Sequence, residues 1–126
     1  MTAEGERRGT RTGVRLLLSW AAVIAVSLLL PADLLPMTLP AGGESSLDQV
    51  GHVFLFFVLA LLAVGPARAR SRHPLLVVLF TSIVYGGLLE ILQGVLGWRS
   101  AELADWVADG VGTAAGVAAS LWWRPT

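Results

Sequence analysis

Polar side chains interrupt three of the most apolar stretches of this sequence, and they do so in closely spaced pairs. The pairs are Asp48 with His52, Glu90 with Gln93, and Asp105 with Asp109. Residues three or four positions apart share one face of a helix, so each helix would present its pair in one direction. Carboxylates and imidazoles are groups that transfer protons and bind divalent cations. The pattern therefore indicates a chemical site inside an otherwise apolar protein.

The excess of carboxylates decides what chemistry such a site could carry out. Buried like charges cannot all stay ionised, so either some carboxylates are protonated or a cation lies among them. One imidazole with several carboxylates suits a divalent ion such as Mg, Mn or Zn. The candidate metal ligands are His52, Glu90, Asp105 and Asp109. An ion held there could activate water or bridge a lipid phosphate, as in a metal-dependent intramembrane hydrolase or transferase.

Other functions fit the same residues without a metal. Paired carboxylates could act as general acid and base, or bind an amine on a drug or a cell-wall precursor. They could also couple a small exporter to protons, or only pin helices together in a structural or partner-dependent membrane subunit. The sequence contains no HExxH metal-binding motif, so the residue types alone do not separate an enzyme from a binding protein.

The composition assigns the chain to the membrane proteins. Of its 126 residues, 55% are hydrophobic and 14% are charged, and the mean hydropathy is +0.70, which is typical of membrane proteins. There are no cysteines, which excludes disulfides and sulfur ligands. The net charge is zero and the arginines are scattered, which argues against nucleic-acid binding.

Four apolar runs supply the elements that must position these side chains. They cover residues 14–30, 47–65, 74–96 and 101–123. Each run has about 17–23 residues, which is the range used by transmembrane helices to fit a hydrocarbon core of about 30 Å at about 1.5 Å per residue. The predicted fold class is therefore an all-α, polytopic membrane protein with four transmembrane helices. Residues 1–13 are expected to form a basic cytoplasmic tail, and residues 14–123 the transmembrane domain.

Local signals mark the ends of these helices. Ser46 opens a capping-box pattern ahead of the second run, which Pro66 is expected to close. Pro74 suits the first turn of the third helix. Gly94 and Gly97 are expected to end that helix, and Ser100 to cap the fourth.

The arginines orient the helices. Eight of the nine basic residues lie before or at the start of the first helix, between the second and third, or after the fourth. Because basic residues favour the cytoplasmic side, both termini are predicted to be cytoplasmic. Arg99, the remaining one, then lies on the outer side with Trp98, while Trp122 and Trp123 lie at the inner interface. At about 1.5 Å per residue, all the polar pairs fall in the outer half of the membrane.

Depth and direction together predict one outward-opening pocket between the second, third and fourth helices. Its predicted members are Asp48, His52, Glu90, Gln93, Arg99, Asp105 and Asp109. A guanidinium at its rim could bind two oxygens of a carboxylate or of a ligand phosphate. Alternatively, these residues have structural roles only. The histidine would then belong to the core, Asp48 would stabilise the N-terminus of its helix, and the other carboxylates would hold helices together. Close helix packing is assigned to four glycines: Gly86, Gly87, Gly112 and Gly116.

The same residues carry a resemblance to a known family. The segments "LDQVGHVFLFFVLALL" and "GLLEILQGVLGWRSAELADWVADGVGTAAG" resemble the VanZ-like family of small bacterial membrane proteins. That family has an Asp with a His four residues on and a Glu-x-x-Gln on a later helix. An Arg then follows a glycine-containing turn, and an Asp is followed four residues later by Asn or Asp and by a glycine-rich helix. The matching positions are Asp48, His52, Glu90, Gln93, Arg99, Asp105, Asp109, Gly112 and Gly116. The resemblance covers about residues 14–120, and it fails at Gln49 and Leu89, where the family often has a lysine and an acid.

The resemblance implies a role in the bacterial cell envelope. The family takes its name from a member linked to resistance against teicoplanin, a glycopeptide antibiotic that binds cell-wall precursors outside the membrane. A multi-pass protein of the bacterial cytoplasmic membrane is therefore implied. Its implied partners are membrane lipid and an envelope lipid, a cell-wall precursor or a glycopeptide-type antibiotic. The resemblance implies no particular reaction and no particular cofactor.

Overall fold

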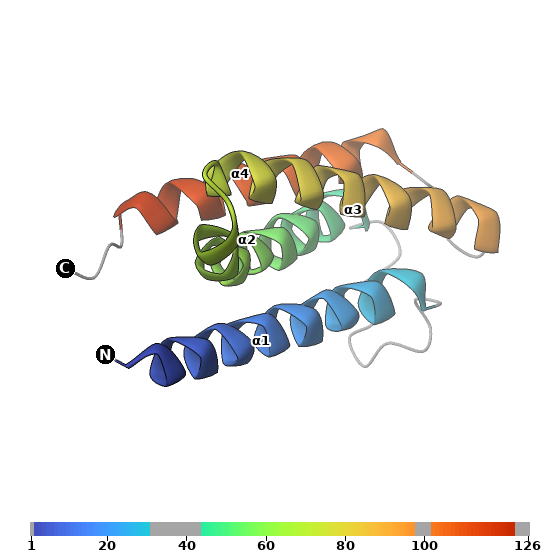
Figure 1. Ribbon diagram of the computed structural model, residues 1–126. Helices are drawn as coiled ribbons and strands as arrows, with labels where there is room; N and C mark the ends of the chain where they lie inside the picture. The colour runs from blue at the N-terminus through green and yellow to red at the C-terminus, as the bar shows by residue number, and fades with distance from the viewer. Residues whose placement is uncertain (1, 31–43, 98–101, 123–126) are drawn as a thin grey trace.

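Four helices make up the described part of the chain, which comprises residues 2–30, 44–97 and 102–122 of a computed structural model, with the side chains of residues 44–48 outside it. The helices are α1 (Ala3–Leu29), α2 (Glu44–Arg70), α3 (Pro74–Leu96) and α4 (Leu103–Trp122) (Figure 1). The prediction of an all-helical fold with four helices is confirmed.

The start of α1 lies well before the predicted position at residue 14. Thr2 has an extended backbone, and its Oγ1 accepts a hydrogen bond from the Gly5 N–H at 3.2 Å, as an N-cap does. Two glutamates in the first turn complement the positive end of the helix dipole. The basic segment predicted as a tail is therefore helical from Ala3. An apolar run marks the part of a helix that meets lipid and does not mark its cap, which is why the two starts differ.

Both ends of α2 differ from the prediction. The helix begins at Glu44, so Ser46 lies inside it and is not its N-cap. It also continues through Pro66 to Arg70. Proline lacks an N–H and crowds the preceding turn, but Arg68 and Arg70 in the last turn complement the negative end of the helix dipole. A proline this near the end costs a hydrogen bond without ending the helix.

The predicted start of α3 is confirmed. Of the two glycines predicted to end the helix, Gly97 does so, whereas Gly94 lies inside it. Pro74 lies in the first turn, where its missing N–H is not needed. Gly97 ends the helix in the left-handed conformation, with φ of 83°, and its N–H donates to the Gln93 carbonyl at 3.3 Å. The next helix begins at Leu103, and the Ser100 predicted to cap it lies outside the described residues.

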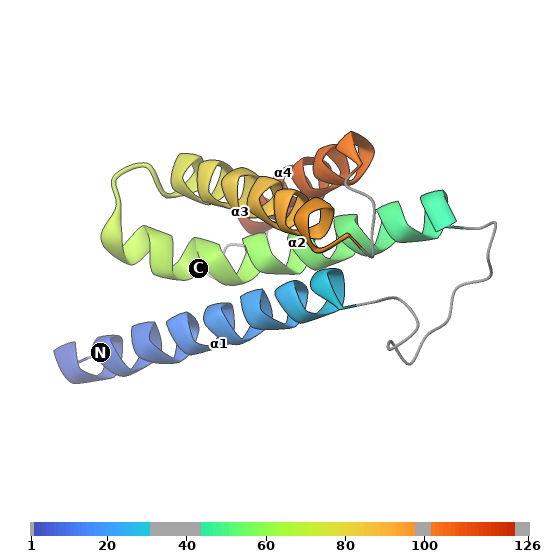
Figure 2. The ribbon, with the colours of Figure 1, turned by 90° about the vertical axis from the view of Figure 1, so that its right-hand side faces the viewer.

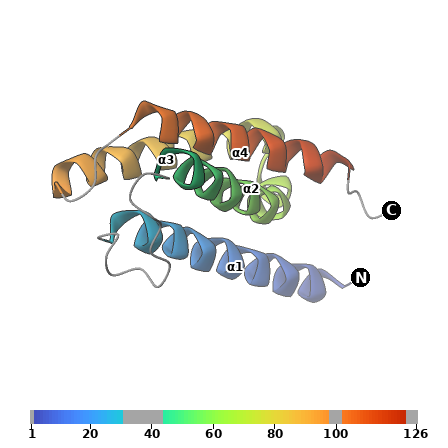
Figure 3. The same ribbon diagram turned by 180° about the vertical axis from the view of Figure 1, so that it is seen from behind.

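The central helix of the molecule is α2. It packs against all three other helices and most extensively against α4, whereas α1 contacts α2 and α3 but not α4 within the described residues. In Figures 1 and 2, α1 lies along one side of the group formed by the other three helices. The turn between α2 and α3 lies at the same end as the start of α1 and the end of α4 (Figures 1 and 3). The start of α2, the end of α3 and the start of α4 therefore lie toward the opposite end (Figures 1 and 3).

Two glycines of α4 permit its close approach to α2. A Cβ atom on Gly112 would overlap the backbone carbonyl of Val53, and one on Gly116 would overlap that of Phe57 and lie 2.7 Å from the Ala60 Cβ. A larger residue at either position would require backbone movement. The two helices are therefore packed backbone to backbone, as small residues four positions apart allow in membrane helices.

The interior is partly polar, while the surface is largely apolar. The buried polar side chains are His52, Ser82, Glu90, Gln93, Asp105, Asp109, Thr113 and Ser120. Large apolar side chains such as Phe80, Val95 and Leu103 are exposed. In water, apolar side chains inside and polar side chains outside would be the stable arrangement. In lipid, exposed apolar side chains cost nothing, whereas exposed polar side chains are destabilising. The distribution suits a protein surrounded by lipid.

Three helical stretches are long and apolar enough to span a membrane. They are α1, Gln49–Arg70 of α2, and α3. The 20-residue α4 is not among them, because two aspartates and several glycines lower its mean hydropathy. The spans agree with the membrane protein predicted from the composition, whereas the fourth predicted span is not confirmed by length and composition alone.

Candidate functional site

His52 of α2 and Asp109 of α4 lie at the centre of a buried polar cluster. His52 Nδ1 is 2.6 Å from Asp109 Oδ1, which makes a short hydrogen bond, and each side chain is 1% exposed. The two residues are 57 positions apart in the sequence. They meet because Gly112, close to Asp109 on α4, lets the backbones of the two helices approach. The bond therefore depends on helix packing and not on local structure.

Asp105 brings a second carboxylate of α4 to the same imidazole. Its Oδ2 lies 3.8 Å from His52 Nε2, and the Asp105 side chain is also buried. Asp105 and Asp109 are one helical turn apart, so both face α2. The imidazole ring therefore lies between two carboxylates, each near a different ring nitrogen.

Glu90 of α3 supplies the third carboxylate. Its Oε2 accepts a hydrogen bond from the Glu102 N–H at 3.1 Å, which satisfies a backbone donor immediately ahead of α4. Gly86, one turn earlier on α3, leaves room for the facing helix, since a Cβ there would lie 2.7 Å from Asp109 Oδ2. One potential ligand atom each from His52, Glu90 and Asp109 lies within 4.8 Å of the other two.

We call the set His52, Glu90, Asp105 and Asp109 the His–acid cluster. Two of its carboxylate oxygens, Glu90 Oε1 and Asp109 Oδ2, have no hydrogen-bond partner among the described residues. Their side chains are only 6% and 1% exposed. A buried acceptor without a partner costs about 1–3 kcal/mol, and a charged one costs more. Both oxygens are therefore places where a proton, a cation or a ligand donor would be stabilised.

Gln93, a predicted member of the pocket, directs its side-chain nitrogen at α1. Its Nε2 donates to the Leu28 carbonyl at 2.6 Å. Leu28 lies at the end of α1, where the last carbonyls have no helical N–H to accept from. The contact holds α1 against α3, so the amide nitrogen of Gln93 takes part in helix packing.

Two other predicted members lie outside the described residues. These are the side chain of Asp48 and the whole of Arg99. The tryptophans predicted at the interfaces divide in the same way, since Trp98 and Trp123 are not described and Trp122 is 92% exposed. The structure thus brings together four of the seven predicted pocket residues.

Sequence reasoning missed one polar member of the interior next to the cluster. Thr113 is fully buried one turn beyond Asp109, and its hydroxyl donates to the Asp109 carbonyl at 2.8 Å. The signal was present, because Asp105, Asp109 and Thr113 follow one another at four-residue spacing on a single face of α4.

The aromatic contacts of α1 were missed as well. The Trp20 indole donates to the Leu55 carbonyl at 2.9 Å, and the Tyr85 hydroxyl donates to the Ala21 carbonyl. The N–H of a buried tryptophan and the hydroxyl of a buried tyrosine need hydrogen-bond partners. The presence of these two residues in apolar helices could therefore have predicted such contacts. Both contacts tie α1 to the helices that carry the His–acid cluster.

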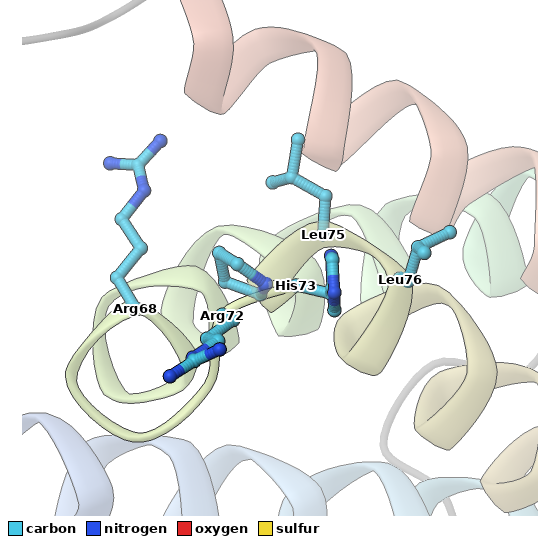
Figure 4. Close-up of a pocket in the computed structure, with 6 residues that line it drawn as sticks. Arg68, Arg72, His73, Leu75 and Leu76 are labelled. Carbon is cyan, nitrogen blue, oxygen red and sulfur yellow. The ribbon is translucent and has the colours of Figure 1, made fainter.

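Two surface cavities lie away from the cluster. One, of about 270 Å³, lies beside the turn between α2 and α3. Its lining residues include Arg68, Arg72 and His73 (Figure 4). The other, of about 460 Å³, lies between α2 and α4 and is lined by residues such as Phe57 and Ser120. No residue of the His–acid cluster lines either cavity.

Comparisons of the chain with protein-family models, curated proteins and solved structures find no match. The geometry of the His–acid cluster is therefore the main basis for a function.

Proposed function

We propose that this chain is a VanZ-like, multi-pass protein of the bacterial cytoplasmic membrane that binds or modifies an envelope ligand through the His–acid cluster. The ligand class is an envelope lipid, a cell-wall precursor or a glycopeptide-type antibiotic. The observation that carries the proposal is the convergence of one imidazole and three carboxylates from α2, α3 and α4 on one buried place.

The energetic cost of the cluster supports a functional role. A single carboxylate in the middle of a membrane helix costs about 2.5–3.5 kcal/mol on insertion scales. Helix packing would be served by groups whose polar atoms are all paired, yet Glu90 Oε1 and Asp109 Oδ2 have no partner among the described residues. Groups that are costly and only partly satisfied are expected where a ligand completes the set.

The position of the cluster supports a ligand from outside the cell. Glu90 lies six residues before the end of α3, or about 9 Å along the helix, and Asp105 lies in the first turn of α4. The arginine distribution predicts that this end of the molecule is extracytoplasmic. A ligand in the outer leaflet would reach the cluster after crossing about two helical turns.

The charge of the cluster favours a ligand with donor groups. Three carboxylates surround one imidazole, so an amine or hydroxyl would find acceptors and an unaccompanied anion would be repelled. Amines and hydroxyls occur on lipid headgroups, on cell-wall precursors and on glycopeptides. The proposed ligand classes share this chemistry.

We take α4 as the fourth span. Its exposed face is apolar, with Leu103, Val107 and Val111 on the surface, whereas Asp105 and Asp109 are buried against α2. A helix that hides its polar residues and exposes its apolar ones suits lipid even when its mean hydropathy is moderate. Four spans also agree with the prediction that both termini are cytoplasmic.

A metal-dependent intramembrane hydrolase or transferase is the second candidate. The observation that favours it is the grouping of His52, Glu90 and Asp109 ligand atoms within 4.8 Å of one another. An ion there could activate water against a lipid-linked phosphate. A proton-coupled exporter or a structural subunit has no comparable observation.

The proposal is tested by purifying the full chain in mild detergent and identifying co-purifying or added envelope lipids and lipid-linked precursors by native mass spectrometry. We expect the wild-type chain to retain such a ligand, and Asp109→Asn to lose it. Glu102→Gln is the matched control, because Glu102 is an exposed carboxylate outside the His–acid cluster. Equal retention by all three proteins, or retention by none, would contradict the proposal. Teicoplanin susceptibility of cells that express the same proteins tests whether a glycopeptide-type antibiotic is the ligand.

A further inference from the structure

We infer that the His–acid cluster is a binding site for one first-row divalent transition-metal ion, with Zn²⁺ as the reference ion. His52, Glu90 and Asp109 are the ligands, and Asp105 is a positioning residue. The inference rests on the proposed function in one respect: both assign a role to the same His–acid cluster. Metal binding can be measured without any envelope ligand.

The first observation is geometric. One donor atom from each of His52, Glu90 and Asp109 lies within 4.8 Å of the other two, and all three side chains are buried. Metal–ligand bonds are about 2.0–2.2 Å long, so two ligands of one ion lie about 3–4 Å apart. The three side chains need only small shifts to close on an ion, and their helices are already packed together.

The second observation is independent of that grouping and concerns missing partners. Glu90 Oε1 and Asp109 Oδ2 are buried oxygens with no hydrogen-bond partner among the described residues. They belong to two helices, α3 and α4, which meet where Gly86 lacks a side chain beside Asp109 Oδ2. Oxygens aimed into a protein interior without donors are what a bound cation would satisfy.

The third observation is the surroundings of the imidazole. Its Nδ1 faces Asp109 at 2.6 Å, and its Nε2 lies 3.8 Å from Asp105 Oδ2. A metal on the Nδ1 side would replace the proton now shared with Asp109. Asp105 would then orient the ring from the other nitrogen, as a carboxylate does behind many metal-bound histidines.

The ligand types select among metals. Mg²⁺ and Ca²⁺ prefer all-oxygen sites, whereas one imidazole with two carboxylates suits Zn²⁺ and its first-row neighbours. Three protein ligands also leave a coordination position for water or a ligand group, as catalytic zinc sites do. The ion would in addition offset the repulsion among the three carboxylates.

Zinc binding by the full chain in detergent tests the inference. The protein is stripped with a chelator and dialysed against Zn²⁺ alone, and its metal content and affinity are measured by elemental mass spectrometry and a competing indicator. We expect about one ion per chain, with at least about tenfold weaker binding in Glu90→Gln and Asp109→Asn. Asp105→Asn should weaken binding less than either.

The matched control is His73→Ala, which removes the other histidine of the chain, at the turn between α2 and α3. It should bind Zn²⁺ like the wild type. Absence of stoichiometric zinc in the wild type, unchanged affinity in Glu90→Gln and Asp109→Asn, or loss of binding in His73→Ala would each overturn the inference. Helical content measured by circular dichroism checks that each variant is folded.

X-ray absorption of the wild-type zinc complex provides a readout that needs no variant. We expect a single imidazole among oxygen ligands, and several imidazoles or none would overturn the inference. The two proposals can fail separately. Envelope-ligand binding by a chain that takes up no zinc would end the metal inference alone, whereas specific zinc binding by a chain that retains no envelope ligand would end the proposed function alone.

Discussion

Glu90 accepts a hydrogen bond from the backbone N–H of Glu102 at 3.1 Å, across the connection between α3 and α4. The same side chain contributes a potential ligand atom beside His52 and Asp109. Its two oxygens thus have different surroundings: Oε2 holds the start of α4, whereas Oε1 has no partner among the described residues. This carboxylate links the packing of the two helices to the chemistry of the His–acid cluster.

Replacing the carboxylates by amides should separate their role in helix packing from their role in the chemistry of the His–acid cluster. Gln at position 90 and Asn at position 109 keep the shape and an acceptor oxygen but remove the charge, which lowers the cost of burial in the membrane. We expect Glu90→Gln and Asp109→Asn to accumulate in the membrane like the wild type, with unfolding temperatures within a few degrees of it. Any envelope phenotype should be lost. Membrane-fraction quantification and thermal unfolding measure this, and disappearance of both variants would show that the carboxylates are helix clasps.

A methyl group at Gly112 should separate α4 from α2. Its Cβ would overlap the Val53 carbonyl, which is backbone and cannot rotate away. We expect Gly112→Ala to lower the free energy of unfolding by about 1–3 kcal/mol. In Gly110→Ala the new Cβ meets nothing within 4 Å, so that variant should be neutral or more stable by up to about 1 kcal/mol. Thermal unfolding in one detergent compares the two, and equal behaviour would mean that the close approach is not needed.

Loss of the Gln93 amide should loosen α1 without affecting the His–acid cluster. The amide donates to the Leu28 carbonyl at 2.6 Å. Removing the donor removes this hydrogen bond between α1 and α3, and such a bond contributes about 0.5–1.5 kcal/mol to stability. We expect Gln93→Met to unfold earlier than Gln49→Met, which makes the same change at the other glutamine of the chain. Binding of ligand or zinc should persist, and its loss in Gln93→Met would return Gln93 to the pocket predicted from the sequence.

The orientation in the membrane can be tested cleanly because the chain has no cysteines. With both termini cytoplasmic, the segment between α1 and α2 is extracytoplasmic and the turn between α2 and α3 is cytoplasmic. We expect Ala41→Cys to react with a membrane-impermeant thiol reagent in intact cells, and Ala69→Cys to react only after lysis. The opposite labelling would put the His–acid cluster on the cytoplasmic side.

Arg99 is predicted to bind two oxygens at once through its planar guanidinium, at the extracytoplasmic edge of the pocket. It is the only basic residue predicted on that side, and a guanidinium can bind two oxygens at once where an ammonium cannot. We therefore expect Arg99→Lys to lose envelope function as fully as Arg99→Ala. Full function in Arg99→Lys would instead identify an anchor for lipid headgroups, which needs only a positive charge.

Local features of the chain were enough to predict several parts of the fold. The four helices follow from apolar runs, and both ends of α3 follow from Pro74 and Gly97, because a missing N–H and a left-handed φ act within a single turn. The direction of the polar pairs also follows from their spacing. Two other helix ends were mispredicted: α1 begins at Ala3, where a local cap precedes the apolar run, and α2 continues through Pro66.

Which polar side chains meet was decided only by the packing of the helices. Residues 105 and 109 share a face from their spacing alone, but their contact with His52 requires α4 to approach α2 at Gly112. Gln93 shares a face with Glu90 as predicted, yet its amide reaches α1, because the Leu28 carbonyl near the end of that helix accepts a hydrogen bond from it. Spacing along one helix is a local property, whereas a partner on another helix depends on how closely and at what height the two backbones pack.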